Sequence, residues 1–267
     1  MIAALPMYDP PWLRAANDRL WSHIARRLRD RGLDDAPAAL DREGEPEDIW
    51  ASPSLLLGQA CGYPLVTRLR ESVQLVATPH YAAEGCEGAF HRAAIVVRRD
   101  DPARVPADLR GRRAGMNGHD SNTGMNLFRA AIAPLAGTAP FFASVAITGS
   151  HARSLAAILS NRIDAASVDA VTLALLRDRY PRHAERVRVL DWTAPSPALP
   201  LITAAGTPPA MVRLLRETLA ALPADPDARD SLRALRITGF TPLGVEAYRP
   251  LLTLAEAAAA LGYKALR

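Results

Sequence analysis

Lysine and cysteine are scarce in this sequence, and so are metal-binding patterns. Lys264 is the only lysine among 32 basic residues, and Cys61 and Cys86 are the only cysteines in 267 residues. Two cysteines are too few for a disulfide-rich scaffold and lack the spacing of a metal site. We therefore expect two free thiols, no metal site and no cofactor.

Long apolar runs and uninterrupted basic runs are also absent. No segment reaches the roughly 18 to 20 apolar residues that span a membrane, so we expect no direct membrane insertion. The net charge is only +4, and the densest basic run, residues 26–31, contains Asp30. Nucleic-acid-binding proteins cluster basic residues on one face or tail, so we expect no nucleic-acid partner. The first residues lack the basic region followed by an apolar region that is typical of a signal peptide. If the chain is complete as written, we therefore expect a cytoplasmic protein.

Helical and strand patterns alternate along the chain, which is typical of an α/β protein. The composition, 49% hydrophobic and 22% charged, is ordinary for a globular protein. A β-branched run predicts a strand at 72–78, and periodic apolar residues predict a helix over 11–31. Ile49-Trp50 is interpreted as a strand end that leads into a helix at 54–61, and the tail from residue 208 on as mostly helical.

The middle of the chain is expected to form a lobe of its own. Residues 97–192 contain enough alternating strands and helices for a complete α/β unit, whereas the blocks before and after them are each incomplete. The simplest solution pairs those two blocks, with each lobe a mixed sheet flanked by helices. We therefore predict a discontinuous lobe 1 (1–95 with 194–267), a lobe 2 (96–193) and hinge strands near 93–98 and 191–198.

Small polar residues follow two predicted strands of the middle block, where each strand leads into a helix. Residues 118–126 include Ser121, Asn122 and Thr123, which can cap a helix while backbone N–H groups at its start point outward. Residues 149–154 place His151 in the first turn of another helix. Helix dipoles favour an anion at such positions. An ordinary capped turn explains either segment alone, but two such junctions in one lobe indicate a ligand site.

Further candidates lie at the ends of other predicted strands. Asp169 closes a short buried strand, and its carboxylate either only caps the next helix or accepts a hydrogen bond from a ligand amine, hydroxyl or protonated oxygen. In the first lobe, Tyr8, Trp50 and Tyr81 follow predicted strands. Plain packing explains any one of them, but several large side chains with a polar tip are typical of a cleft wall.

The order of these motifs resembles that of phosphate/phosphite/phosphonate-binding proteins, the substrate-binding components of ABC importers. The resemblance covers nearly the whole chain and implies a two-lobed type II periplasmic-binding-protein fold, a Venus flytrap that closes over one ligand. It also implies an ABC permease as partner and, where a signal peptide has been removed, a periplasmic location. The motifs are Pro6-Met7-Tyr8, Asp48-Ile49-Trp50, Ser121-Asn122-Thr123-Gly124, Gly149-Ser150-His151, Asp164–Asp169 and Pro195-Ser196-Pro197.

The resemblance further implies which residues bind the ligand. In that family the oxyanion is held by a helix start that matches Ser121, Asn122 and Thr123, by a histidine that matches His151 and by an aspartate that matches Asp169. Tyrosines of the first lobe cover the ligand, and Tyr8 and Tyr81 are the candidates, with Trp50 beside them on the list of expected ligand-binding residues. The expected function is binding of a small phosphonate-like or phosphate-like oxyanion by a monomer without catalytic residues.

Two other functions are compatible with the same fold. Enzymes for pyrimidine-cofactor or menaquinone-precursor synthesis or for desulfination need a nucleophile or base, and Cys86 with His91 or His80 is the only nucleophilic set that the sequence offers. A cytoplasmic ligand sensor without an importer would also keep the fold. An upstream signal sequence and neighbouring permease genes would favour transport over both.

Overall fold

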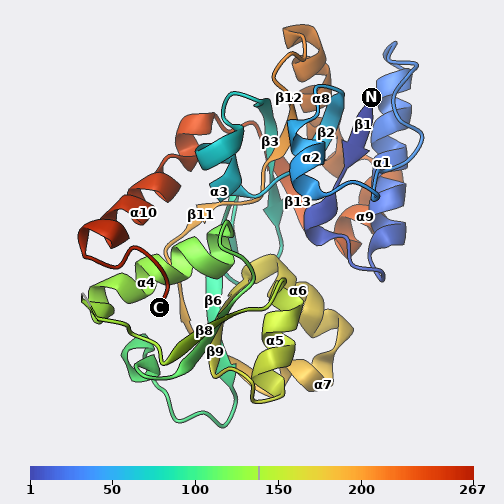
Figure 1. Cartoon of the computed structure of the whole chain (residues 1–267). Coiled ribbons are helices and arrows are strands. Elements are labelled where there is room, and N and C mark those ends of the chain that lie inside the picture. The colour runs from blue at the N-terminus through green and yellow to red at the C-terminus, as the bar shows by residue number, and fades with distance from the viewer. Residues whose placement is uncertain (138) are drawn as a thin grey trace. The chain divides into compact units, whose positions relative to one another are not determined.

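The chain folds into two compact units in a computed structural model, which describes residues 1–137 and 139–267 (Figure 1). Both units are discontinuous in sequence, because the chain passes from one to the other several times. Short strands, β4 (Cys86–Glu87), β5 (Phe90–His91) and β11 (Ser196–Pro197), lie at these passages. Unit 1 comprises Met1–Ala82, Glu87–Ala89 and Pro197–Tyr248, and unit 2 comprises Ala83–Cys86, Phe90–Ser196 and Arg249–Arg267.

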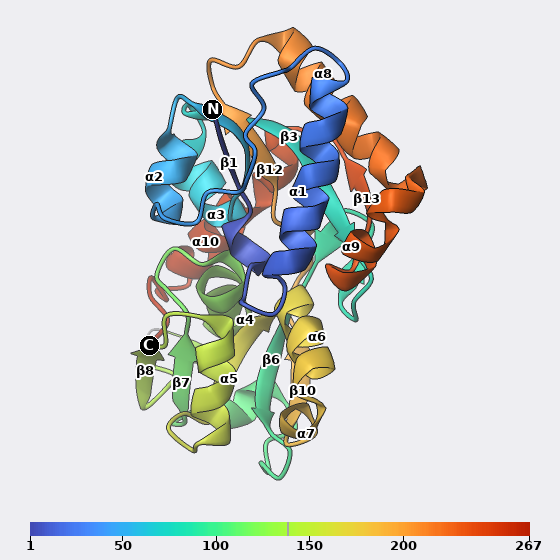
Figure 2. The ribbon, with the colours of Figure 1, turned by 90° about the vertical axis from the view of Figure 1, so that its right-hand side faces the viewer.

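Unit 1 is built on a five-stranded mixed sheet with the order β1-β2-β12-β3-β13. β1 and β2 run parallel, whereas β12 is antiparallel to both of its neighbours and β13 is antiparallel to β3. The helix α1 crosses in front of this sheet and packs against α8 and α9 (Figure 2). The strands are β1 (Ile2–Ala4), β2 (Leu55–Gln59), β3 (Val73–Tyr81), β12 (Leu201–Ala204) and β13 (Ile237–Thr241). The helices are α1 (Arg14–Arg29), α2 (Pro46–Ala51), α3 (Gly62–Pro64), α8 (Pro209–Ala221) and α9 (Arg229–Ala234).

Two predicted elements of unit 1 are wrong. The segment predicted as a helix contains the strand β2, and the predicted strand end Ile49-Trp50 lies in the helix α2. Leu55, Leu56 and Leu57 are all buried, because β2 is an inner strand of the sheet. A short continuous apolar run has neither helical nor strand periodicity, so the sequence does not distinguish the two. The strand β13 also interrupts the tail that was expected to be mostly helical.

Unit 2 contains the second five-stranded mixed sheet, with the order β10-β6-β9-β7-β8. β7 runs parallel to both β8 and β9, whereas β6 is antiparallel to β9 and β10. Helix α4 covers one side of this sheet and α5 and α6 the other, and α10 packs against α4 (Figure 1). The strands are β6 (Ala93–Arg98), β7 (Arg113–Met116), β8 (Ser144–Ile147), β9 (Ala165–Asp169) and β10 (Val187–Trp192). The helices are α4 (Leu127–Ala136), α5 (His151–Leu159), α6 (Ala170–Arg179), α7 (Pro181–Ala184) and α10 (Pro250–Ala260), and a π-helical turn (Asn122–Asn126) precedes α4.

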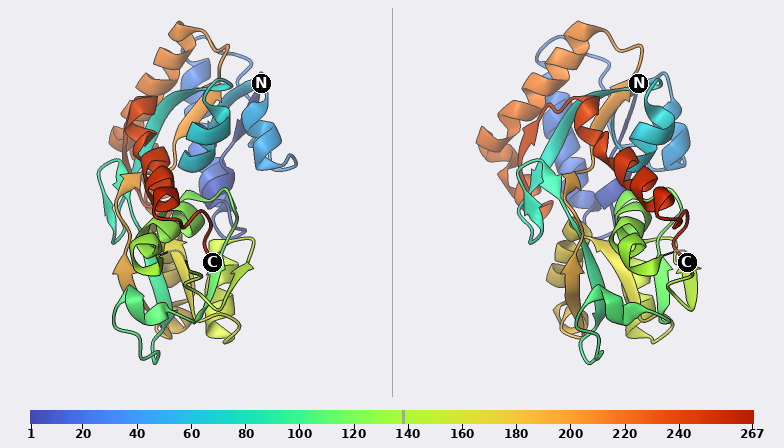
Figure 3. Two further views of the ribbon diagram at one scale, coloured as in Figure 1. Left: turned by 60° about the vertical axis from the view of Figure 1, so that its left-hand side comes forward. Right: turned by 90° about the vertical axis from the view of Figure 1, so that its left-hand side faces the viewer.

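The C-terminal residues 249–267 belong to unit 2, whereas the predicted boundaries place them in the first lobe. α10 lies beside α4 (Figure 3), and the side-chain amide of Asn126 donates to the Leu251 carbonyl at 3.0 Å. The backbone N–H of Phe141 donates to the Arg267 carbonyl at 2.7 Å. These contacts join residues more than 100 positions apart, and periodicity within the tail carries no information about its partner.

None of the helices formed by the described residues is long and apolar enough to cross a membrane. Cys61 and Cys86 form no disulfide in this part of the chain, and both are partly buried.

Candidate functional site

One edge of the unit 2 sheet gathers most of the polar residues singled out in the sequence. β7, β8 and β9 are parallel, so their carboxyl ends meet at this edge. Asn117 directly follows β7, His151 comes shortly after β8, and Asp169 ends β9. Ala93 at the start of the antiparallel β6 pairs with Asp169, which brings His91 to the same edge. We call this edge, with the π-helical turn beside it, the polar edge of unit 2.

The predicted residues Ser121 and Asn122 hold the start of the π-helical turn. Ser121 caps it, because its Oγ accepts from the backbone N–H of Gly124 at 3.0 Å. The buried Asn122 side chain donates to the hydroxyl of Ser196 at 3.0 Å and accepts from Asn126 at 3.4 Å. Both side chains therefore fix the backbone, and the first N–H groups of the turn are the donors that this geometry offers to an anion.

Thr123 connects the turn to two other elements of the polar edge. Its Oγ1 lies 3.0 Å from Nε2 of His151, which opens α5. The hydroxyl of Ser167, in β9, donates to the Thr123 carbonyl at 2.6 Å. Side chains alternate along a strand, so Ser167 and Asp169 share one face of β9, the face that carries Thr123. The structure thus brings Thr123, His151 and Asp169 together, as a common site requires.

The charges of His151 and Asp169 are set by burial and by each other. Burial lowers the pKa of His151 from its usual value, against the opposite effects of Asp169 and of the Ser167 backbone, so the neutral imidazole is favoured. For Asp169 burial alone would raise the pKa, but the hydrogen bond and charge of His91, with the charge of His151 and the Thr172 N–H, lower it to about 2. Asp169 is therefore a carboxylate at neutral pH.

Two polar residues of this edge, Asn117 and His91, were not among the predicted site residues. Asn117 Oδ1 is buried, and no hydrogen-bond partner for it occurs among residues 1–137 and 139–267. A Cβ on Gly124 would overlap this oxygen and lie 2.8 Å from Asn117 Cγ, so only glycine lets the amide approach the turn. The sequence did contain a sign of Asn117, because this residue directly follows a predicted strand. The prediction gave weight only to the capping motif at Ser121, a few residues further on.

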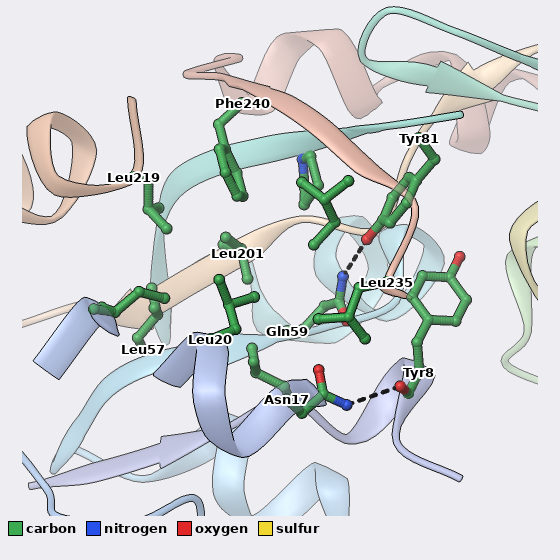
Figure 4. Close-up of a pocket in the computed structure, with 14 residues that line it drawn as sticks. Tyr8, Asn17, Leu20, Leu57, Gln59, Tyr81, Leu201, Leu219, Leu235 and Phe240 are labelled. Carbon is green, nitrogen blue, oxygen red and sulfur yellow. Dashed lines mark hydrogen bonds between the residues drawn. The ribbon is translucent and has the colours of Figure 1, made fainter. Parts of the chain in front are cut away.

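In unit 1 the structure brings together two of the three predicted residues. The rings of Tyr8 and Tyr81 meet edge to face, with centroids 5.4 Å apart and an interplanar angle of 78°. Gln59 donates from Nε2 to the Tyr81 hydroxyl at 2.9 Å (Figure 4). Trp50 lies apart from this pair, buried in α2, where its indole N–H donates to the Gln59 carbonyl at 2.9 Å. Trp50 thus has a packing role in this unit.

Tyr8 and Tyr81 also line a small cavity between α1, α8 and the sheet (Figure 4). The cavity has a volume of about 30 Å³, so it holds no more than a few atoms. Apart from Asn17, Gln59 and the two tyrosines, its walls are apolar, with Leu57 and Phe240 from the sheet and Leu20 from α1. The wall thus combines apolar side chains with a few polar groups, which is the composition typical of a surface that covers a ligand.

The candidate nucleophile of the enzyme hypothesis, Cys86, is unsuited to that role. Burial, with the Asp169 charge, raises the pKa of the Cys86 thiol to about 12. A thiolate is the reactive form of cysteine, so Cys86 stays a thiol at neutral pH. His91 is engaged with Asp169, and Nε2 of His80 lies 2.7 Å from the Thr241 hydroxyl. Within the described residues no cluster of three or more His, Cys, Asp or Glu side chains could hold a metal ion.

The chain matches a protein-family model. The model of the ABC transporter phosphonate periplasmic substrate-binding proteins matches residues 56–248, which is more than two thirds of the chain. A comparison with curated protein sequences gives no match.

Solved structures with the same fold cover nearly the whole chain. PhnD1 from Prochlorococcus marinus, in complex with methylphosphonate, gives a TM-score of 0.75 at 11% identity, over 97% of this chain and 98% of the other. A binding protein of an ABC phosphonate transporter from Pseudomonas aeruginosa gives 0.74 at 13% identity, over 97% and 87%. XAC2383 from Xanthomonas citri, bound to chloride, gives 0.73 at 20% identity, over 98% of each chain. These likenesses, with the two mixed α/β units, confirm the predicted two-lobed type II periplasmic-binding-protein fold.

Proposed function

Because the chain belongs to the family of ABC-transporter phosphonate periplasmic substrate-binding proteins, we propose that it binds a small phosphonate-type oxyanion at the polar edge of unit 2. The family match over residues 56–248 confirms the resemblance and the class of function that the sequence motifs predict. What the proposal adds is the place of binding and the side chains that carry it.

The observation that carries the proposal is the cluster of donors around Thr123. Its hydroxyl and the His151 ring are 3.0 Å apart, and the backbone N–H groups of Asn122 and Thr123 stand at the positive end of the helical segment formed by the turn and α4. Neutral hydroxyl, imidazole and amide N–H groups bind an oxyanion without the cost of burying a second full charge. Ser121 and Asn122 support this arrangement through the bonds that fix the turn.

Relatives support an anion as the ligand class. The Prochlorococcus protein is in complex with methylphosphonate, and the Xanthomonas protein, which resembles this chain over nearly its whole length, is bound to chloride in one structure and to ATP in another. Methylphosphonate is therefore the first ligand to test, with phosphite and phosphate as anions of similar shape. Sulfate is the comparison anion because its shape is like that of phosphate but it carries no proton at neutral pH.

The family is one of transport proteins, and we extend three of its properties to this chain as part of the proposal. They are delivery of the ligand to an ABC permease, action in the periplasm and the absence of catalysis. The raised pKa of Cys86 supports the last, because the chain lacks a reactive thiolate at that position. Product formation from bound methylphosphonate, followed by mass spectrometry, would contradict it.

The proposed roles of Tyr8, Trp50 and Tyr81 differ in their support. The edge-to-face pair of Tyr8 and Tyr81 suits contact with a ligand substituent, because both rings lie at one wall of the unit 1 cavity. Trp50 binds the Gln59 carbonyl and is proposed to act on the ligand only through Gln59 and Tyr81. Tyr81→Phe should then weaken methylphosphonate binding more than Trp50→Phe does.

Isothermal titration of the chain with methylphosphonate, phosphite, phosphate and sulfate tests the proposal. Thr123→Val keeps the shape of the side chain and removes its hydroxyl, so binding of the preferred anion should weaken by about 1.5 to 3 kcal/mol, the usual worth of a hydrogen bond to a charged group. Thr253→Val is the matched control, since Thr253 is exposed on α10 of the same unit.

Two results would contradict the proposal. One is the absence of binding of all four anions by the wild-type chain. The other is binding that stays unchanged in Thr123→Val, which would place the ligand elsewhere in the molecule.

A further inference from the structure

His91 is a buried titratable residue that the proposed donor cluster does not use. It ends the short strand β5, two positions before β6, and it is 1% exposed. Burial of a histidine away from water is costly unless its ring has a polar partner. The ring of His91 therefore calls for an explanation at the polar edge.

The partner of His91 is Asp169. His91 Nδ1 lies 3.0 Å from Asp169 Oδ2, and the two side chains are 0% and 3% exposed. The other carboxylate oxygen, Oδ1, accepts from the backbone N–H of Thr172 in the first turn of α6 at 2.8 Å. Each oxygen of Asp169 thus lies against a different nitrogen, so the carboxylate cannot turn without losing one of these two contacts.

The charge of Asp169 also needs a counterpart in this place. An anionic ligand beside a buried carboxylate is repelled unless a nearby positive group offsets the negative charge. The groups that face Asp169 are His91, His151 at the start of α5, the thiol of Cys86 and the positive end of α6. Of these groups His91 lies directly against the carboxylate, with its Nδ1 3.0 Å from Asp169 Oδ2.

We propose that His91 is a positioning residue that holds Asp169 as an oriented acceptor, so that the site prefers oxyanions that carry a proton. This inference rests on the proposed function and adds the ligand class within it. An ionised carboxylate only accepts hydrogen bonds, so a ligand oxygen that faces it must carry a proton. Singly ionised methylphosphonate, phosphite and phosphate each carry at least one acidic O–H proton, whereas fully ionised sulfate carries none.

Two substitutions of nearly equal shape separate positioning from packing. In His91→Asn the side-chain Nδ2 takes the place of the histidine Nδ1 and can still donate to Asp169. In His91→Leu the same branched outline carries no donor. His183→Asn is the matched control, because His183 is exposed on α7 of the same unit. Each chain is checked by thermal unfolding and then titrated with methylphosphonate and with sulfate at neutral pH.

His91→Leu should weaken methylphosphonate binding roughly tenfold or more, as for the loss of a hydrogen bond to a charged group, and reduce the preference over sulfate. His91→Asn should recover most of the affinity and the preference. In an Asp169→Asn background His91→Leu should change the affinity by less than about threefold, because its effect passes through the carboxylate. A packing role would produce the same loss in both backgrounds.

Several outcomes would overturn the inference. Equal losses in His91→Asn and His91→Leu would exclude a positioned donor, and an undiminished effect in the Asp169→Asn background would exclude action through the carboxylate. If His91→Leu does not fold, His91→Asn decides, and loss of the preference over sulfate in that variant counts against the role. Failure of the wild-type chain to bind any of the anions overturns the proposed function and this role with it, whereas binding without selectivity overturns this role alone.

Discussion

Gly124→Ala is expected to damage the oxyanion site by adding a single carbon atom. The new Cβ would overlap Asn117 Oδ1 and would lie 2.8 Å from Asn117 Cγ and 3.1 Å from Cε1 of His151. The Asn117 amide must rotate away, and the His151 ring must shift by a few tenths of an ångström. The change therefore reaches the contact between His151 and Thr123, which is 3.0 Å long in the wild-type chain.

The size of the effect follows from the kind of contact. Forcing a methyl group into a packed site costs about 1 to 3 kcal/mol, and here the atoms that give way belong to the site itself. If about half of that cost falls on the bound state, methylphosphonate affinity should drop roughly 2- to 12-fold. The free energy of unfolding should fall by a similar amount or less, because Gly124 lies in a turn capped by Ser121.

Isothermal titration and urea unfolding of Gly124→Ala measure the two quantities. The double variant Gly124→Ala/Asn117→Ala serves as the internal control, because removal of the amide makes room for the new methyl group. The double variant should bind more tightly than expected from the sum of the two single changes. Wild-type affinity in Gly124→Ala, or strictly additive losses, would refute the reasoning.

Three further changes are expected to act through single contacts. Gly85→Ala should destabilise unit 2 by about 1 to 3 kcal/mol in urea unfolding, because its φ is +84° and a Cβ would meet the Trp192 ring at 2.8 Å; unchanged stability would contradict this. The lowered pKa of Asp169 means that its contribution to stability is complete above the unfolded value near 3.9 and is lost as pH falls through about 2, so the stability gap between wild type and Asp169→Asn should narrow by roughly 2 kcal/mol between pH 5 and pH 2. A constant gap would argue against an ionised Asp169. Tyr81→Phe should lower the free energy of unfolding by about 1 kcal/mol, since the buried Gln59 amide loses its acceptor. The double variant Tyr81→Phe/Gln59→Leu removes this unpaired amide and should recover part of the loss, so an equal loss in the double variant would contradict the explanation.

The sequence predicted the elements with clear periodicity or β-branched runs. α1 and β3 lie where the helix over 11–31 and the strand at 72–78 were expected, and the turn at Ser121 begins where its capping pattern places it. β2 was mistaken for a helix because its three consecutive leucines are buried on both faces of the sheet. The placement of 249–267 in unit 2 depends on the contacts of Leu251 with Asn126 and of Arg267 with Phe141, which no local pattern encodes.

The same distinction holds for the candidate site. Ser121, Thr123, His151 and Asp169 were found because each follows a strand and opens a helix, and the parallel strands bring those positions to one edge. His91 was considered only as a partner of Cys86, because it precedes an antiparallel strand, and its position beside Asp169 follows from the pairing of Ala93 with that residue. The direction of a strand is a property of the assembled sheet. The sequence therefore does not show that the residues before β6 lie at the same edge as the carboxyl end of β9.

The side-chain nitrogens of the histidines report most directly on the central claim, that a phosphonate binds beside Thr123 and His151 in unit 2. Long-range ¹H–¹⁵N spectra of the full chain, with His151 assigned by its loss in His151→Gln, should be recorded with and without saturating methylphosphonate. The account predicts a large shift of the His151 Nε2 resonance, which sits 3.0 Å from Thr123 Oγ1, and no shift of the exposed His183. An unmoved His151 resonance in a chain that titration calorimetry shows to be saturated would contradict it.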